Sequence, residues 1–506
     1  MRRDNSLAIA DLRSTTSATI DAFAVPYTLQ LCEAIERFTA AAAAQDPAGW
    51  HYDGADLRYA VERQLYFELI NDPLLYECFA RGASAGSDGR AGRLSRSARL
   101  LAPYLLGRRS AAARPPVLSR VRSAIASAMQ RSRSAAAPVM RSEGIAAGAR
   151  PVLFLVIQPK FVEFLSPVAA AAGLPYAFLA VHDARLPGYL AERSLPRIAA
   201  EVPPKARARA NLASAMADFP ELALTYDAML AAIERFQPRL IVLPEGNAPI
   251  YEVANRAGRA RGVPVLCIQQ GWSPIVHSGF RNMTYTRMCV WGEGFAELLR
   301  SYNPGQHFAV TGNHLVRLRP PADALKRQGI GFFLQKGSRL ISDEGWRACL
   351  ELIRWSARQF PESEMRVREH PSTPLSAEER RSIAGFPNVT IMAPATHKLD
   401  DVLVGCRVAV SVFSTTLLEA AAAGTVPLIL NITGMPHYHP DIAGAGAAIE
   451  VTDFDAARTG LTRLMRDERA PAAFATALEI CQRRFFARDR DAALTATAAE
   501  VTALAG

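Results

Sequence analysis

The sequence predicts an α/β protein with two Rossmann-like domains that face a cleft, preceded by an extra helical N-terminal region. Short apolar runs alternate with helical stretches from about residue 151 onward, as they do in βα units. The alternation occurs in two successive halves of roughly 150 residues each, the size of one such domain. Half of the 506 residues are apolar and 21% are charged, which excludes a disordered or collagen-like chain.

Residues 1–80 are predicted to be mostly helical. The segments LQLCEAIERFTAAAA and ADLRYAVERQLYFELI both place apolar residues three or four positions apart. Asp11 and Arg13 interrupt the first residues before any hydrophobic stretch begins, so we expect no secretory signal. No apolar run approaches the roughly 18 residues that a membrane span needs, and we therefore expect none.

Residues 81–150 form an arginine-rich basic segment. They contain 14 arginines, no lysine and two acidic residues, whereas the whole chain carries a formal charge of +10. Apolar residues recur at helical spacing over 117–129, with Arg120 and Arg122 off that face. A basic amphipathic helix suits an anionic membrane surface; the alternative is a surface helix packed on its own domain. Few aromatic residues are present for base stacking, so we expect no nucleic-acid partner.

Residues 151–316 are predicted to form the first Rossmann-like domain. Its predicted strands are continuous apolar runs, which are typical of strands buried on both faces. They lie at 151–157, 175–181, 239–244, 263–269 and 286–291, and a short run at 308–312 ends this half. Helices are predicted within 205–236 and 249–261.

Residues 325–475 are predicted to form the second Rossmann-like domain, after a charged, proline-rich linker at 315–324. Its predicted strands lie at 330–335, 364–369, 388–393, 407–412 and 426–431. Helices are predicted at 343–360 and 415–423. The end of the chain, 453–505, is predicted to form two or three helices, and those of 476–506 lie beyond the second domain.

Ligands of open α/β sheets bind at the carboxyl ends of the strands, so the residues that follow each strand are the candidates for function. Glu245-Gly246-Asn247 follows the strand at 239–244. A carboxylate at this position could act as general base toward an acceptor hydroxyl. The alternative is a helix N-terminal cap for 249–261.

Gln270-Gly271-Trp272 follows the strand at 263–269. Gly271 allows the backbone to approach a ligand closely, and the Gln270 amide can both donate and accept hydrogen bonds. The Trp272 ring could stack on a base or a sugar, or it could be a lid or core residue. These three residues are therefore candidates for acceptor or substrate binding.

His370 and Pro371 follow the strand at 364–369. The proline ends the strand and fixes the backbone beside the imidazole. By alternation along the strand, Arg366 and Arg368 are expected nearby, which suits a phosphate. The alternative is a structural histidine.

Three hydroxyl side chains, Ser414, Thr415 and Thr416, stand between the strand at 407–412 and the following helix. Free N–H groups at a helix start attract anions, and a single cap explains only one of the hydroxyls. Glu419 lies one turn further on the same face. It could bind a ribose hydroxyl, or it could be a solvated helix carboxylate.

Lys336 follows the strand at 330–335 and could contact a phosphate, although a plain exposed loop is the alternative. His437 and His439 lack carboxylate or cysteine neighbours, so no metal site is expected there. The seven cysteines are widely spaced without a CxxC motif, which indicates reduced thiols in a cytosolic protein without a cysteine zinc site.

The order of these motifs resembles bacterial surface-polysaccharide glycosyltransferases of the GT-B type. Similar proteins are capsule-synthesis proteins, CDP-glycerol glycerophosphotransferases and bacterial sialyltransferases. The motifs in this chain are the Glu-Gly pair, Gln-Gly-Trp, Trp-Gly-Glu, Val-Thr-Gly-Asn, His-Pro and Ser-Thr-Thr-Leu-Leu-Glu-Ala. The resemblance covers about 150–490, including RRFFARDRDAA, and does not cover 1–150.

The resemblance implies roles for individual residues. Glu245 corresponds to the base, with Pro244 in place of the first acid of the family motif. His370-Pro371 corresponds to the pair that contacts the donor phosphate and nucleotide, and Ser414-Thr415 to the phosphate-binding hydroxyls. Gln270 stands where capsule proteins and glycerophosphotransferases have a histidine before the glycine.

The activity that the resemblance implies is transfer of a sugar, or a glycerol-phosphate-like unit, from a CMP-, CDP- or UDP-activated donor. The acceptor would be a surface polysaccharide or a lipid-linked glycan, bound by the first domain, with the donor on the second. Transfer would be inverting and independent of metals and cofactors, on the inner face of the cytoplasmic membrane. Two alternatives remain open: an epimerase or hydrolase of the same fold, and a non-catalytic membrane-surface component of a polysaccharide assembly complex.

Overall fold

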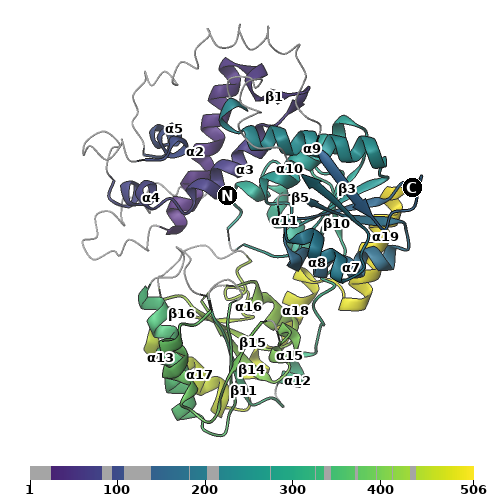
Figure 1. Cartoon of the computed structure of the whole chain (residues 1–506). Coiled ribbons are helices and arrows are strands. Elements are labelled where there is room, and N and C mark those ends of the chain that lie inside the picture. Colours follow the sequence, from purple (N-terminus) through teal and green to yellow (C-terminus); the bar gives the residue numbers. More distant parts are fainter. Residues whose placement is uncertain are drawn as a thin grey trace.

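The computed structural model describes residues 24–82, 94–106, 138–181, 183–201, 216–273, 275–324, 326–335, 343–370, 374–394, 396–412, 414–432 and 440–506. Two lobes, each built on a mainly parallel sheet, lie one below the other in Figure 1, and a group of helices from the start of the chain lies beside the first lobe. The predicted α/β fold with two Rossmann-like domains is confirmed.

The first lobe contains an eight-stranded sheet in the order β10-β9-β8-β7-β4-β5-β6-β3. Its strands are β3 (Val139–Glu143), β4 (Val152–Val156), β5 (Tyr176–Val181), β6 (Arg197–Glu201), β7 (Leu240–Pro244), β8 (Val265–Ile268), β9 (Arg287–Val290) and β10 (Phe308–Val310). Neighbouring strands pair in parallel except at β3, which is antiparallel to β6. The strand order reverses between β4 and β7, and such a reversal is where ligands of α/β sheets bind.

All the strands predicted for this half are present, and β3 and β6 are additional. β6 alternates between buried and more exposed residues, and β3 is an almost entirely exposed edge strand. Neither is a continuous apolar run, which was the signal used to predict strands. Because β3 lies within 81–150, the first sheet begins before residue 151.

The helices of this lobe cover both faces of the sheet, as expected for a doubly wound fold. They are α7 (Pro159–Ala172), α8 (Leu186–Glu192), α9 (Pro220–Phe236), α10 (Pro249–Ala260) and α11 (Glu293–Arg300), with short 3-10 turns η6 (Met216–Asp218) and η7 (Ser278–Phe280). The helix predicted at 249–261 is confirmed. The helix predicted within 205–236 begins only at Pro220, and residues 202–215 lie outside the described part.

The second lobe contains a six-stranded parallel sheet in the order β13-β12-β11-β14-β15-β16. Its strands are β11 (Gly329–Phe333), β12 (Met365–Arg368), β13 (Val389–Met392), β14 (Cys406–Ser411), β15 (Val426–Leu430) and β16 (Ile449–Val451). Its helices are α12 (Pro321–Ala324), α13 (Asp343–Gln359), α14 (Ala377–Ala384), α15 (Leu399–Leu403), α16 (Thr415–Ala422) and α17 (Phe454–Arg466). The five predicted strands are present, β16 is additional, and the order again reverses beside the first strand, between β11 and β14.

The C-terminal segment returns from the second lobe to the first. It comprises η8 (Pro471–Phe474), α18 (Ala475–Phe485) and α19 (Arg490–Ala505). On α18, the Gln482 amide donates to the carbonyls of Ala421 and Ala422 in the second lobe, at 3.0 Å each. On α19, the Thr502 hydroxyl donates to the Ala172 carbonyl of the first lobe at 3.4 Å.

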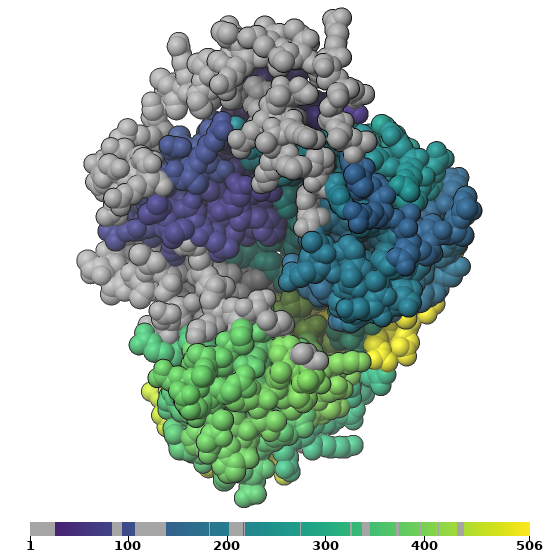
Figure 2. Space-filling model, viewed as in Figure 1, coloured from purple at the N-terminus to yellow at the C-terminus, as the bar shows by residue number. Residues whose placement is uncertain are grey.

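The described helices of the N-terminal region pack directly on the first lobe (Figure 2). They are α2 (Ala24–Gln45), η2 (Pro47–Trp50), α3 (Arg58–Leu69), α4 (Pro73–Ala80) and α5 (Arg96–Leu105), with a small hairpin of β1 (His51–Tyr52) and β2 (Ala55–Asp56). Polar contacts join the two parts: Tyr52 donates to Asp227 at 2.7 Å, and Arg281 pairs with Glu36 at 3.1 Å. Their buried apolar residues belong to one continuous core.

Two predictions concern a membrane, and the described residues test only one of them. No helix in the described ranges is both long and apolar enough to cross a bilayer. The basic amphipathic helix expected over 117–129 lies outside the described residues, so its relation to a membrane stays a prediction. All seven cysteines are buried free thiols.

Gly292 lies where α11 begins, and it contacts α18. A Cβ atom at this position would be 2.3 Å from the Arg484 carbonyl oxygen and 2.6 Å from the Phe485 carbonyl carbon. Because these are backbone atoms, we expect Gly292→Ala to lower the free energy of unfolding by about 1–3 kcal/mol. Denaturant unfolding measures the change. Gly305→Ala, where a Cβ would meet open space, is the matched control; equal stability of the two variants would contradict this packing.

Candidate active site

The carboxyl ends of the two sheets face each other across the boundary between the lobes. Trp272 follows β8 of the first sheet, and Thr415 begins α16, directly after β14 of the second. The Thr415 hydroxyl donates to the Trp272 carbonyl at 2.9 Å and accepts from the Trp272 N–H at 3.3 Å. The residues predicted at these two strand ends are therefore brought together.

Lys160 connects the two sides electrostatically. It lies in the first turn of α7, immediately after β4, and its side chain is exposed. Its positive charge acts both on the Glu245 carboxyl of the first lobe and on the His370 imidazole of the second. These three side chains therefore share one electrostatic environment at the inter-lobe boundary.

Glu245 is presented on a left-handed turn. Its φ is +61° and that of Gly246 is +78°, a conformation that costs a residue other than glycine about 1–3 kcal/mol. The Glu245 N–H donates to the Ile268 carbonyl at 2.8 Å, which ties the turn to β8. A Cβ on residue 246 would be 2.6 Å from the Cys267 Sγ, so glycine is required there. Non-glycine strain of this kind clusters at functional sites.

The surroundings of Glu245 favour a reactive carboxyl. Burial raises the pKa of the Glu245 carboxyl, while Lys160 and a hydrogen bond from the Asn247 side chain act in the opposite direction. A Cβ on Gly271 would lie 3.2 Å from the Glu245 Oε1, so this glycine leaves room for the carboxylate. The Asn247 side chain therefore orients the predicted base, and Gly271 lies beside it.

The Tyr251 hydroxyl is buried close to the same carboxyl. Burial raises the pKa of this phenol well above its ordinary value, and the Glu245 charge acts in the same direction. Among the described residues its oxygen has no hydrogen-bond partner. Tyr251 therefore adds a polar group to the floor of the Glu245 site.

On the second lobe, Arg368 at the end of β12 interacts with Glu419 on α16. Burial lowers the pKa of the Arg368 guanidinium and raises the pKa of the Glu419 carboxyl to about 7; in each case the partner's charge opposes the effect. The Arg368 Nε is buried and has no hydrogen-bond partner within the described ranges. Glu419 is partly buried, and its role toward a ribose hydroxyl stays a prediction.

His370 lies beside this pair. Burial lowers the pKa of its imidazole, and the positive charges of Arg368 and Lys160 lower it further. The preceding Glu369 is buried and accepts from the Leu375 N–H at 3.0 Å and from Arg380 at 2.7 Å, which fixes the chain on both sides of the histidine. His370 is thus a neutral imidazole held beside cations.

Two of the three hydroxyls at the start of α16, those of Ser414 and Thr415, already have protein partners. The Ser414 Oγ caps the helix by accepting from the Thr416 N–H at 3.2 Å, and the Thr415 hydroxyl bonds the Trp272 backbone. A phosphate at this helix start would have to share or replace those bonds.

Of the other predicted positions, Arg366 differs from expectation, and Trp272 and Gln270 are described by their packing. Arg366 does not accompany Arg368: it pairs with Glu364 at 2.8 Å and donates to the Val402 carbonyl at 3.1 Å, near the start of the strand. The Trp272 ring packs on Phe280 and Phe295, with centroids 5.5 and 4.9 Å away. Gln270 is half-buried beside Gly271. Trp272 is thus largely committed to packing.

Several candidates have no described position. Lys336, Pro371, His437 and His439 lie outside the described residues, so their proposed roles stay predictions. In the ranges that the structure covers, no group of three or more histidine, cysteine, aspartate or glutamate side chains could hold a metal ion.

Lys160 is a residue that sequence reasoning missed. It follows β4, the strand next to which the order of the sheet reverses. Inspecting the residues after every predicted strand, including 151–157, would have found it. Tyr251 and Tyr285 carry no comparable signal, because neither directly follows a predicted strand.

Comparisons with known proteins show the fold of this chain, but they do not assign it to a protein family. No model of a known protein family matches this sequence, and no curated protein matches it. The chain is similar to the UDP-GlcNAc 2-epimerase from Neisseria meningitidis bound to UDP-GlcNAc, at 14% identity and a TM-score of 0.50, over 70% of this chain and 99% of the other.

Two further solved structures are less similar. MurG from Acinetobacter baumannii has 15% identity and a TM-score of 0.43, over 65% of this chain and 95% of the other. The spinosyn rhamnosyltransferase SpnG, complexed with spinosyn aglycone, has 15% identity and a TM-score of 0.42, over 70% and 100%. The two opposed parallel sheets and the first similarity define a GT-B fold.

The Glu419 carboxyl makes the stability of the fold depend on pH. Its pKa of about 7 exceeds its ordinary value of 4.5, so its contribution is fully present below pH 4.5 and is lost as pH rises through 7. Glu419→Gln remains neutral, and we expect it to be more stable than the native protein by about 1–3 kcal/mol at pH 8 and equally stable at pH 4. Denaturant unfolding at both values tests this; a difference independent of pH, or one shared with the exposed Glu468→Gln, would contradict it.

Proposed function

We propose that the protein is a GT-B type glycosyltransferase that moves a sugar from a nucleotide-activated donor to an acceptor hydroxyl. One observation carries the proposal: the carboxyl on the strained turn at Glu245 shares an electrostatic environment, through Lys160, with the cationic site around His370 on the opposite lobe. A base on one side and an anion site on the other are what sugar transfer requires. Similarity in fold to a UDP-GlcNAc 2-epimerase bound to UDP-GlcNAc supports such a donor.

The donor phosphate is proposed to bind the second lobe. Arg368 supplies a guanidinium whose Nε has no hydrogen-bond partner among the described residues, which favours phosphate binding. His370 is neutral and donates a hydrogen bond, and Lys160 adds positive charge from the first lobe. Together these groups stabilise the negative charge that develops on the leaving nucleotide. Ser414, Thr415 and Thr416 add donors once the phosphate displaces the bonds to Trp272, and Glu419 accepts from a ribose hydroxyl.

The acceptor is proposed to bind the first lobe, next to Glu245. The carboxylate takes the proton of the acceptor hydroxyl while that oxygen bonds to the anomeric carbon. The bond from this carbon to the donor phosphate oxygen breaks, and its electron pair leaves with the nucleotide. A single displacement inverts the configuration at the anomeric carbon. Arginine, lysine and imidazole groups serve the leaving phosphate, so neither a metal nor a further cofactor is part of the proposal.

The finer assignments rest on the motif resemblance. They are a CMP-, CDP- or UDP-activated donor, a surface-polysaccharide or lipid-linked acceptor, and a location on the inner face of the cytoplasmic membrane. The arginine-rich segment 81–150 would supply the positive charge for anionic headgroups there. A glycerol-phosphate-like unit in place of the sugar would use the same phosphate site.

We expect Glu245→Gln to reduce kcat for transfer about 10²–10⁴-fold, because the amide cannot accept the acceptor proton. The affinity for donor nucleotide should stay nearly unchanged. Product analysis with a radiolabelled donor, with and without acceptor, measures transfer and separates it from epimerisation or hydrolysis. Glu468→Gln is the control for loss of an exposed carboxylate. A near-normal transfer rate would remove Glu245 as the base, and efficient turnover without any acceptor would favour the epimerase or hydrolase.

We expect His370→Ala to weaken nucleotide binding about tenfold, since it removes one hydrogen bond to a charged phosphate. A bound nucleotide stabilises the folded state by mass action, so thermal shift with CMP, CDP, UDP and GDP measures affinity and identifies the nucleotide. His307→Ala, on the segment before β10, is the control histidine. Unchanged affinity in His370→Ala would place the donor elsewhere, and no shift with any nucleotide would favour a non-catalytic component.

A further inference from the structure

We propose that the N-terminal helical region positions the catalytic carboxyl, through a relay from Arg63 on α3 to Tyr285 and from Tyr285 to the Gly246 carbonyl. The role for Glu245 that this relay serves rests on the proposed function. Arg63 and Tyr285 are positioning residues, since they act on the turn that carries Glu245 and not on the substrate.

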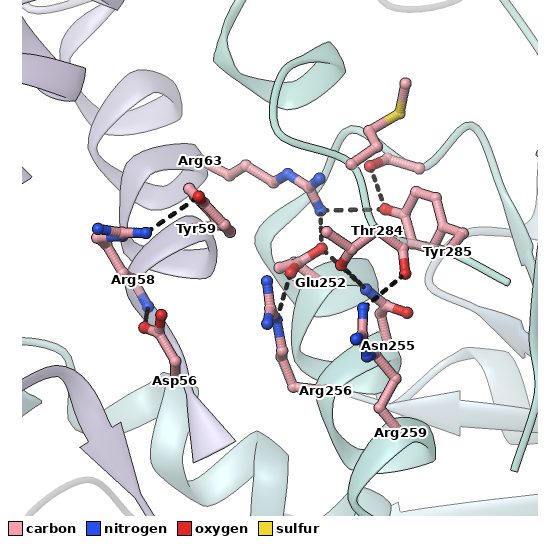
Figure 3. Close-up of polar contacts among 12 residues, drawn as sticks. Asp56, Arg58, Tyr59, Arg63, Glu252, Asn255, Arg256, Arg259, Thr284 and Tyr285 are labelled. Atoms are coloured by element: carbon pink, nitrogen blue, oxygen red, sulfur yellow. Dashed lines mark hydrogen bonds and ion pairs between the residues drawn. The ribbon is translucent and has the colours of Figure 1, made fainter. Parts of the chain in front are cut away.

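Arg63 reaches from the N-terminal region into the first lobe (Figure 3). Its side chain is completely buried, and its Nη1 lies 3.1 Å from the Glu252 Oε2 on α10, a carboxylate that is also completely buried. The same nitrogen donates to the Tyr285 hydroxyl at 3.0 Å. A buried guanidinium is costly unless it is paired, so these contacts fix its place.

The Tyr285 hydroxyl connects Arg63 to the turn at Glu245-Gly246. It donates to the Gly246 carbonyl oxygen at 2.7 Å, and the edge of the ring lies 3.2 Å from where a Cβ on residue 246 would be. A guanidinium has donors and no acceptor, so Arg63 can only donate to this oxygen. The single proton of the phenol must then point away from Arg63, toward Gly246. Arg63 thereby sets the direction of the hydrogen bond that holds the turn.

Glu252 is itself held in place by its neighbours on α10. It accepts from Arg256 at 2.7 Å and from Asn255 at 3.4 Å, and Asn255 also donates to Thr284 at 2.9 Å (Figure 3). Thr284 immediately precedes Tyr285. The network therefore returns to the tyrosine by a second path, and both members of the relay are fixed at their far ends.

The position of the turn matters because its backbone is strained. The Glu245 N–H bond to Ile268 holds the side toward β8, and the bond from Tyr285 holds the Gly246 carbonyl two peptide units further on. Without the second bond the turn can relax and move the carboxylate relative to the acceptor. A displacement of about 1 Å is enough to cost a reaction roughly 10²-fold.

Tyr285→Phe breaks the relay with the least disturbance, because the ring remains and Arg63 keeps Glu252. We expect hydrogen exchange in a peptide spanning 244–248 to become at least fivefold faster, and kcat to fall 10- to 100-fold with an unchanged nucleotide affinity. Tyr226→Phe is the matched control, since the Tyr226 hydroxyl is also buried and has no hydrogen-bond partner in the described part of the chain. That variant should leave both measurements unchanged.

Hydrogen exchange needs no substrate, so it separates the relay from the proposed chemistry. Unchanged exchange in folded Tyr285→Phe overturns the relay. Faster exchange with an unchanged kcat, in a protein that Glu245→Gln inactivates, overturns the positioning role. Faster exchange together with full activity in Glu245→Gln overturns the proposed function while the relay stands. Arg63→Lys, which keeps the charge but loses the forked donor, should give a kcat between those of the native protein and Tyr285→Phe. Native exchange over 244–248 together with a native kcat in folded Arg63→Lys overturns Arg63 as the source of the constraint.

Discussion

The left-handed turn at Glu245 is the constraint on which the candidate site depends. A non-glycine residue holds this conformation only when its surroundings determine it more strongly than its own preference does. Here the surroundings come from three directions: the Ile268 carbonyl on β8, the close packing of Gly246 against Cys267, and the Tyr285 hydroxyl. Strain at one residue is thus offset by hydrogen bonds and packing at its neighbours, and the carboxyl has a fixed place at the sheet edge.

The opposite side of the site depends on burial of charge. Arg368, Glu419 and His370 all have pKa values that burial shifts toward their neutral forms. Desolvated groups of this kind interact more strongly with a ligand charge than exposed ones do, because water screens them less. The inter-lobe bonds between Thr415 and Trp272 occupy the helix start that an incoming phosphate would need. Under the proposed function, donor binding and contact between the lobes would compete for the same hydroxyl.

Strand positions could be predicted from the sequence because buried parallel strands are continuous apolar runs, as in 151–157 and 426–431. β3 and β6 were not predicted because neither is a continuous apolar run: β3 is the exposed edge strand, and its neighbour β6 alternates between buried and more exposed residues. Rules for strand ends identified Glu245, His370 and Ser414, and topology brought their elements together. The same rules misplaced Arg366, because alternation gives a face of the sheet but not the distance from the strand end. The residues that hold the turn could not be predicted, since Arg63 lies 182 positions before Glu245 in the chain and Tyr285 lies 40 positions after it.

The return of the chain through α18 and α19 has a mechanical consequence. The peptide backbone crosses between the lobes twice, once near 315–320 and once near 486–490. Because the lobes are joined at these two crossings, rotation about the line through both of them is the one relative motion that stretches neither. Sliding or twisting of one lobe against the other would stretch one of the crossings. The lobes can therefore open by a hinge rotation about this line, and closure restores the same register between the two sheet edges.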